Sequence, residues 1–202
     1  MRDNLTLFLL LASVSGLAQA FDRSDGVQVH CAVERNGEQR IVSEVWLGHG
    51  DAGDRHPELG GAAAVVRQDE QGWPVIYFDR VTIKPIRENE PHMLDFIFYH
   101  ECAHATDPAR DEIEANCEAY LELDKLGMMN DTLERALARS HRKMMRLPSR
   151  YGGSGTAFWD KTMACVNARR APAGEADLAN ASVPSPDPAA SAASASAAPA
   201  AP

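Results

Sequence analysis

The chain has 202 residues, 45% of them hydrophobic, which is enough for one domain with a core of its own. Its formal net charge is −9 at pH 7, with 29 acidic residues against 20 basic ones. Nucleic acids and anionic membranes attract basic surfaces, so this balance argues against either of them as the main partner.

The first twenty residues have the pattern of a secretory signal peptide. Arg2 precedes an apolar stretch from Leu5 to Leu17, and Ala18-Gln19-Ala20 fits a small-residue cleavage site. The stretch is short for a membrane span, and no other segment of the chain is a candidate. We therefore expect a mature protein that begins at Phe21, spans no membrane and is exported, either to the periplasm or as a secreted protein.

Four runs rich in β-branched and aromatic residues come next, followed by four longer helical patterns. The expected strands are 27–33, 41–47, 62–66 and 75–78, separated by turns rich in Gly and Asp. The expected helices are 91–105, 108–127, 131–147 and 155–168. A small mixed sheet followed by helices indicates a single α+β domain over residues 21–170.

Residues 171–202 consist almost entirely of Ala, Pro, Ser, Asp and Glu. With no aromatic residue and little else to bury, this tail is expected to be disordered. Its carboxylates are Glu175, Asp177 and Asp187, so the domain itself is only mildly acidic.

The pentapeptide His100-Glu101-Cys102-Ala103-His104 is an HExxH motif within the first expected helix. Residues four apart share one helix face, so both imidazoles can bind one zinc ion at roughly 2.0–2.1 Å. Glu101 is rotated away from this pair, and it can act as general base towards a water and later as general acid. The preceding residues 93–99 are almost wholly apolar, as expected for a helix that is buried in a core.

A strand before a buried HExxH helix resembles the zincin metallopeptidases, and here the strand is Pro74-Val75-Ile76-Tyr77-Phe78. The resemblance implies a zincin-like domain, one zinc ion, and an extended peptide bound along a strand edge beside the ion. The metzincin pattern fails, because Arg110 occupies the place of its third His.

The run Glu112-Ile113-Glu114-Ala115-Asn116-Cys117 is instead similar to the Glu-x-x-Ala-Asp-Cys form of some gluzincins. This resemblance makes Glu112 the third zinc ligand. Asn116 then stands where the family has an Asp that supports a ligand His, and it can accept the same hydrogen bond without bringing a charge.

Helix geometry favours Glu112 independently but leaves alternatives open. Asp107 and Pro108 fit the N-cap and first residue of the next helix, which would run antiparallel to the motif helix. Counted back from that turn, Glu112 lies level with the midpoint of the two His, and Glu114 about 3 Å further along. Glu114, Asp107 and Asp111 remain alternative ligands.

Four Cys follow the cleavage site, and no two of them have the C-x-x-C spacing of a Cys-rich zinc site. In an oxidising compartment an even count predicts two disulfides, for which three connectivities are possible. Cys31 and Cys165 lie near the two ends of the domain and can staple its termini. Cys102 and Cys117 resemble a Cys pair that flanks the motifs of some small secreted zincins, so we favour these two pairings.

The residue that stabilises the oxyanion is expected beyond the third ligand, where zincins resembling this chain often use a His, Tyr or Arg. We select His141 and Tyr151 from the available side chains, Tyr151 because it lies in a glycine-rich loop, and loops often carry function on a rigid scaffold. Arg142, Arg146 and Arg150 are also present in this part of the chain.

These residues together predict an exported, zinc-dependent peptidase that acts on a peptide or protein substrate. One Zn²⁺ per chain would be held by His100, His104 and Glu112, with Glu101 as the proton carrier. The alternative is a zinc-stabilised binding or interaction module of the cell envelope with little turnover. Glu101 argues against that alternative, because a structural zinc site has no use for a base beside an open coordination position.

Overall fold

The computed structural model describes residues 20–48, 59, 61–144 and 147–170. The expected tail and all but the last residue of the expected signal peptide lie outside the described residues. Within the described part, strands precede helices, so the expected α+β class is confirmed. No helix in that part is long and apolar enough to cross a membrane.

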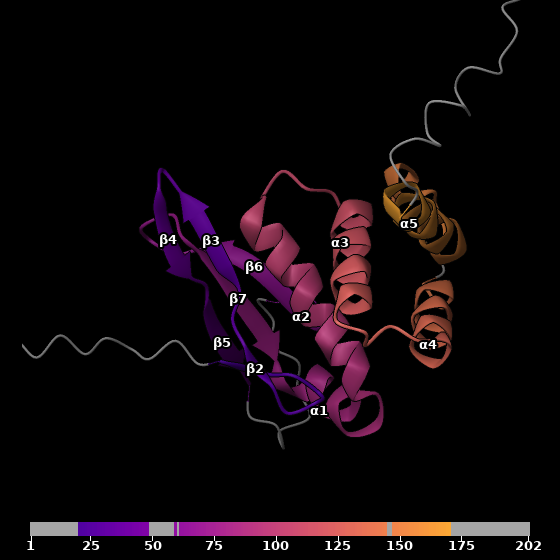
Figure 1. Ribbon diagram of the computed structural model, residues 1–202, viewed down its shortest axis with the longest axis horizontal. Coiled ribbons are helices and arrows are strands. Elements are labelled where there is room, and N and C mark those ends of the chain that lie inside the picture. Colours follow the sequence, from indigo (N-terminus) through magenta and orange to yellow (C-terminus); the bar gives the residue numbers. More distant parts are fainter. Residues whose placement is uncertain (1–19, 49–58, 60, 145–146, 171–202) are drawn as a thin grey trace, which may run out of the picture. The chain divides into compact units, whose positions relative to one another are not determined.

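The largest sheet has three strands in the order β5-β7-β6 (Figure 1). Its middle strand β7 (Pro74–Asp79) pairs in parallel with β5 (Ser43–Leu47) and antiparallel with β6 (Ala64–Gln68). Five of the six residues of β7 are buried, which explains its nearly unbroken apolar sequence. The strand that precedes the motif helix is therefore central in this sheet, and β6 forms one of its two edges.

Two small antiparallel pairs precede this sheet. β1 (Phe21–Asp22) pairs with β2 (Gln28–Val29), and β3 (Ala32–Arg35) pairs with β4 (Glu38–Ile41). The expected strand 27–33 is thus divided between two ladders. Asn36 and Gly37 both have positive φ, 54° and 79°, as a two-residue hairpin turn of this hand requires.

The helices of the described residues are α1 (Arg80–Asn89), α2 (Pro91–Thr106), α3 (Glu112–Lys125), α4 (Asp131–Arg142) and α5 (Gly155–Arg170). A short 3₁₀ helix, η2 (Ser149–Tyr151), lies before α5. The sequence pattern did not predict α1, which contains Pro85, a residue that normally argues against a helix interior. α1 is capped by the buried Asp79, which accepts hydrogen bonds from Val81 N at 3.1 Å and Thr82 Oγ1 at 2.7 Å.

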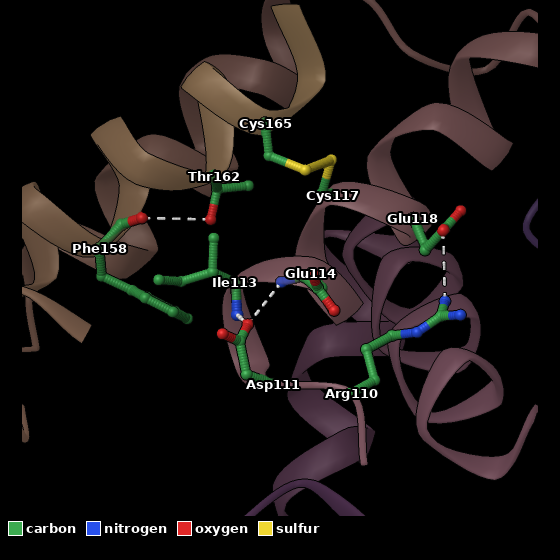
Figure 2. Close-up of a disulfide and its surroundings, with 9 residues drawn as sticks. All are labelled: Arg110, Asp111, Ile113, Glu114, Cys117, Glu118, Phe158, Thr162 and Cys165. Carbon is green, nitrogen blue, oxygen red and sulfur yellow. Dashed lines mark hydrogen bonds and ion pairs between the residues drawn. A yellow bond between two sulfur atoms is a disulfide. The ribbon is translucent and has the colours of Figure 1, made fainter. Parts of the chain in front are cut away.

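The predicted start of α3 at Asp107 and Pro108 is wrong. The N-cap is Asp111, whose Oδ1 accepts from the backbone N of Ile113 at 2.8 Å and of Glu114 at 2.9 Å (Figure 2). Asp107 instead follows α2, and its side chain accepts from Ala109 N at 3.0 Å within the turn. Asp111 satisfies two N–H groups of the first turn of the helix, so the helix begins at Glu112.

α2 is buried by two separate hydrophobic clusters. Towards the strands, Leu94 and Phe98 join a cluster in which the Phe98 and Phe21 rings stack at 4.2 Å. Towards α3, α4 and α5, Met93 and Phe96 join a second cluster with residues such as Tyr120, Leu137 and Trp159. Because apolar side chains emerge on more than one side, the sequence of α2 is apolar nearly all round, as expected for a fully buried helix.

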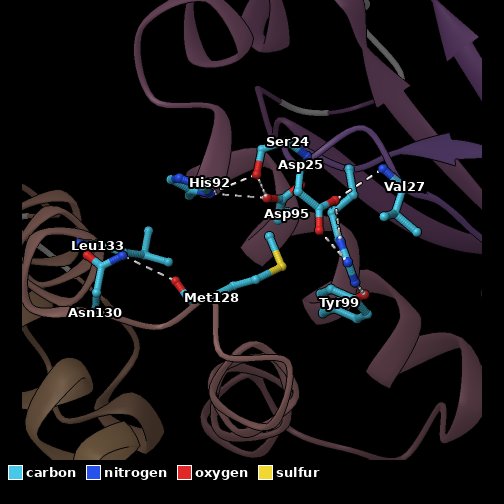
Figure 3. Close-up of polar contacts among 10 residues, drawn as sticks. Ser24, Asp25, Val27, His92, Asp95, Tyr99, Met128, Asn130 and Leu133 are labelled. Carbon is cyan, nitrogen blue, oxygen red and sulfur yellow. Dashed lines mark hydrogen bonds and ion pairs between the residues drawn. The ribbon is translucent and has the colours of Figure 1, made fainter.

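Polar contacts also hold the first half of α2 to the turn after β1 (Figure 3). Asp95 is only 1% exposed, and it accepts hydrogen bonds from both the backbone N and the Oγ of Ser24. Ser24 Oγ also lies 2.7 Å from His92 Nδ1. The buried carboxylate is therefore satisfied by hydrogen bonds, which offset the cost of removing it from water.

The four Cys form two disulfides, as predicted, but the predicted pairing is wrong. Cys31 is bonded to Cys102, and Cys117 to Cys165 (Figure 2), with Cα separations of 5.5 and 6.0 Å. Cys102 packs against the strand-side cluster, whereas Cys117 is buried in the helical cluster. The two side chains therefore face different cores, although their helices are neighbours. Two disulfides are compatible with an extracellular or periplasmic protein.

Peptide mapping of the non-reduced protein should recover the 31–102 and 117–165 links, because these pairs meet the Cα separation that a disulfide needs. Replacing both Cys31 and Cys102 by Ser should lower the free energy of unfolding by about 2–5 kcal/mol. The double variant Cys117→Ser/Cys165→Ser, which removes the second disulfide instead, is the matched control. A recovered 31–165 peptide would contradict the structure.

Glu44 in β5 is a buried carboxylate that the fold does not satisfy. It is 8% exposed, and neither of its oxygens has a hydrogen-bond partner among the described residues. Burial, and secondly the charge of Asp22, raise the pKa of Glu44 to about 8 from an ordinary value near 4.5. Between these two pH values the unfolded chain releases a proton that the folded chain keeps, so the stability of the fold decreases as pH rises.

Glu44→Gln removes this titration, because the amide is neutral at every pH. The free energy of unfolding of the variant, relative to wild type, should increase between pH 4.5 and pH 8 by on the order of 1 kcal/mol or more. Chemical denaturation at pH 4.5, 6 and 8 measures the difference. A difference that does not change with pH would show that Glu44 titrates normally in the folded protein.

Candidate metal and catalytic site

The HExxH residues lie in the last two turns of α2. His100 and His104 are four residues apart, and their rings lie 4.8 Å from each other on one side of the helix. Their side chains are 15% and 18% exposed, so each imidazole is mostly buried but reaches an open space. Two neutral imidazoles arranged in this way are a common pair of metal ligands.

Glu112, the first residue of α3, completes a group of three ligand atoms. Its Oε2 lies 3.2 Å from His100 Nε2 and 3.6 Å from His104 Nε2. Ligand atoms of the three residues all lie within 4.8 Å of one another, so the group could hold a metal ion. The connection between the helices is short, and the N-cap at Asp111 fixes where α3 begins, so the carboxylate is brought to the two imidazoles.

The three alternative ligands have other positions. Asp111 and Asp107 are exposed, and both accept hydrogen bonds from backbone N–H groups of the turn and of α3. Glu114 is exposed, two residues beyond Glu112. Within the described part of the chain, none of the three belongs to a group of side chains that could hold a metal ion.

The electrostatics of the group follow from its unlike charges. Hydrogen bonds from His100 and His104 hold the pKa of Glu112 far below its usual range, so its carboxylate stays ionised. The hydrogen bond with Glu112 in turn raises the pKa of His104. A proton and a metal ion therefore compete for the same nitrogen lone pairs, which makes metal affinity depend on pH.

Glu101 lies beside this group and contacts the backbone of β6. It is 7% exposed, and it accepts a hydrogen bond from the backbone N–H of Val66. Burial raises the pKa of Glu101, although the nearby His100 and His104 oppose this effect. A carboxyl group whose pKa is raised towards neutrality is suited to accept and return a proton.

Asn116 lies behind His100. Its Oδ1 is 2.8 Å from His100 Nδ1, and its Nδ2 is 3.1 Å from Nε2 of His141. The other ring nitrogen of His141, Nδ1, is 2.8 Å from the backbone oxygen of Leu137. Burial lowers the pKa of His141, so this imidazole is neutral at physiological pH.

A cavity of about 940 Å³ opens in front of these residues, and every site residue expected from the sequence lines it. They are His100, Glu101, His104, Glu112, Asn116, His141 and Tyr151. Tyr151 lies in η2, where its ring packs against Phe158 at 5.6 Å and under the guanidinium of Arg150 at 4.7 Å. Its hydroxyl makes no hydrogen bond to a described residue.

Strand β6 forms another wall of the cavity, a role that its sequence does not reveal. Asp69 N donates to Trp73 O, and Asp79 N donates to Ala63 O, so residues 63, 65, 67 and 69 exchange hydrogen bonds with the β7 side. In an antiparallel ladder the alternate residues turn their N–H and C=O groups the other way. Ala64, Val66 and Gln68 therefore present backbone groups to the free edge, and Val66 uses its N–H for Glu101.

No protein-family model, curated protein or solved structure matches this chain. The interpretation of the site therefore depends on its own residues and geometry.

Glu112→Ala should weaken binding of a divalent ion by about 100-fold or more, since loss of a direct ligand costs at least as much as loss of an outer-shell partner. Glu114→Ala is the matched control, because this exposed carboxylate lies outside the group, and its affinity should stay near that of wild type. Competition with a chromophoric chelator measures both affinities. Equal losses in the two variants would remove Glu112 from the site.

Proposed function

We propose that this chain is an exported zinc peptidase of the gluzincin type with a zincin-like domain. The observation that carries the proposal is the meeting of His100, His104 and Glu112 next to the buried Glu101, at a cavity that is bounded by a strand edge. Neither the HExxH motif nor the nearby Glu112 carboxylate is specific by itself, since HExxH can arise by chance and acidic groups often lie near His. Together they supply a metal site and a proton carrier in one place.

The donor atoms fit zinc. Two imidazole nitrogens and one carboxylate oxygen are a common protein ligand set for a catalytic zinc ion, with the fourth position open to water. Ligands of a tetrahedral zinc ion at roughly 2.0–2.1 Å are about 3.3 Å apart. The two separations that involve Glu112 are 3.2 and 3.6 Å, close to that value.

Bound at this position, zinc would polarise the scissile carbonyl and lower the pKa of the attacking water towards ~7. The remaining chemistry belongs to the protein. Glu101 takes the proton from the attacking water and delivers it to the leaving amine, a role for which its raised pKa is suited. We assign to Tyr151 the donation of a hydrogen bond to the developing oxyanion, because it lines the same cavity and its hydroxyl has no partner among the described residues.

The substrate class follows from the edge of β6. The backbone groups that Ala64 and Gln68 turn away from β7 have no partner among the described residues, and they would allow an extended peptide to add as a further strand beside the site, as the resemblance to zincins implies. The edge that serves this role is β6, whereas the strand before the motif helix is the central β7. Disulfides and the signal-peptide pattern support action outside the cytoplasm, on a peptide or protein substrate.

Glu101→Gln should keep the fold and the bound zinc but reduce hydrolysis of casein or a mixed peptide library by about 10²–10⁴-fold, because only the proton carrier is lost. Zinc content, melting temperature and peptide release are measured on the same samples. Glu114→Gln, which neutralises an exposed carboxylate of α3, is the control. Undiminished cleavage by Glu101→Gln would refute the role of Glu101. A wild-type protein that holds zinc yet cleaves nothing would favour a zinc-stabilised binding module.

A further inference from the structure

An unbroken chain of hydrogen bonds joins His100 to the backbone of α4. It runs from His100 Nδ1 to the amide of Asn116, from that amide to His141 Nε2, and from His141 Nδ1 to the carbonyl oxygen of Leu137. The three donor–acceptor distances are 2.8, 3.1 and 2.8 Å. Asn116 and His141 are 2% and 6% exposed, so water has little opportunity to replace either partner.

The fixed end of the chain determines the direction of every hydrogen bond in it. A backbone carbonyl only accepts, so Nδ1 of His141 must carry a proton. The imidazole is neutral because burial lowers its pKa, so its Nε2 is left as an acceptor. Asn116 must therefore turn its NH₂ group to His141, and this orientation places its carbonyl oxygen towards His100.

The same logic sets the protonation of His100. The amide oxygen of Asn116 can only accept, so it requires a proton on His100 Nδ1. In the metal-free protein Nε2 donates to Glu112, and loss of that proton on metal binding leaves the Nε2 lone pair on the side where Glu112 and His104 lie, because Nδ1 keeps its own proton. The opposite amide orientation would put the NH₂ group against Nδ1 and favour a proton on Nε2, the atom that a metal ion needs.

We propose that the Leu137 carbonyl and His141 fix the orientation of the Asn116 amide and thereby hold His100 in the tautomer that binds metal. His141 is on this view a positioning residue that acts through Asn116. The proposal rests on the proposed function only in taking His100 as a metal ligand. The direction of the hydrogen bonds themselves does not require a metal.

The surroundings of His141 agree with a supporting role. Its ring lies among the rings of Phe96, Phe158 and Trp159, at centroid distances of 6.3, 5.5 and 5.0 Å. Both ring nitrogens already have partners in the protein, so neither is available to an oxyanion. The sequence prediction of His141 as an oxyanion stabiliser is therefore replaced here by a role behind the metal ligand.

The proposal also explains why residue 116 is Asn where the gluzincin pattern has Asp. A carboxylate could accept from His100 as well as an amide does, but it has no N–H to donate to His141. With a carboxylate at 116, a neutral His141 would have to donate from Nε2 and would leave its Nδ1 facing the Leu137 oxygen without a proton. A doubly protonated His141 would instead bring a cation among buried aromatic rings. Asn116 and a neutral His141 thus form a matched pair.

The first test needs no metal. In the metal-free protein labelled with ¹⁵N-histidine, two-bond ¹⁵N–¹H spectra at pH 8 should show His141 as the neutral tautomer with its proton on Nδ1. A proton on Nε2 would overturn the proposal, whatever the protein's metal affinity. Failure of wild type to bind zinc would instead count against the proposed function and leave this spectrum interpretable.

The second test compares three variants by chelator competition for Zn²⁺, with melting temperatures recorded alongside. His141→Leu leaves the Asn116 NH₂ without an acceptor and should weaken zinc binding on the order of 10-fold. His141→Gln restores an acceptor oxygen near the place of Nε2 and should recover affinity to within about threefold of wild type. Trp159→Phe, which changes the packing around His141 but none of the hydrogen bonds, should leave affinity unchanged. Wild-type affinity in His141→Leu, or equal losses in all three variants, would overturn the proposal.

Discussion

Burial of α2 between two hydrophobic clusters is the constraint on which the rest of the site depends. A helix held on both sides cannot rotate about its axis without exposing apolar side chains, so the directions of its polar residues are fixed. Neighbouring residues differ by about 100° around the axis. His100 is consequently directed towards α3, while Glu101, the next residue, is directed towards the backbone of β6.

The second constraint is the position of α3. Asp111 caps the helix, and the connection from α2 is short, so Glu112 is held beside the two imidazoles. Each disulfide includes a residue next to a site residue: Cys102 follows Glu101, and Cys117 follows Asn116. Because these two Cys are bonded to different parts of the chain, the helices that carry the site are fastened independently, one to the strand region and one to α5.

Burial of polar groups serves the site in two different ways. Asn116 and His141 are buried with every hydrogen bond in a consistent direction, which on our proposal restricts His100, a candidate metal ligand, to one tautomer. Glu101 is buried with less support, and its raised pKa is the result. In an interior of low polarity, a buried polar group with all its hydrogen bonds made is thus held in one orientation, whereas a buried carboxyl with few hydrogen bonds has a raised pKa.

The sequence alone determined the parts of this protein that depend on local spacing. The two His and the Glu of the motif helix, the apolar character of α2 and the order of strands before helices follow from periodicity over a few residues. The resemblance to gluzincins and the helix count both pointed to Glu112, because a short connection between two helices leaves few possible registers. The start of α3 was misplaced by four residues, since Asp107 and Asp111 are equally good caps in sequence and only their contacts distinguish them.

Only the tertiary structure decided the features that join distant segments. The disulfide pairing predicted from the sequence was wrong, because pairing depends on which hydrophobic cluster each Cys faces. Cys102 and Cys117 face different clusters. The choice of β6 as the edge beside the site depends on strand order, which no single strand encodes. The contact between Asn116 and His141 spans 25 residues and two helices, so its direction could be read only once packing had brought a carbonyl, an imidazole and an amide together.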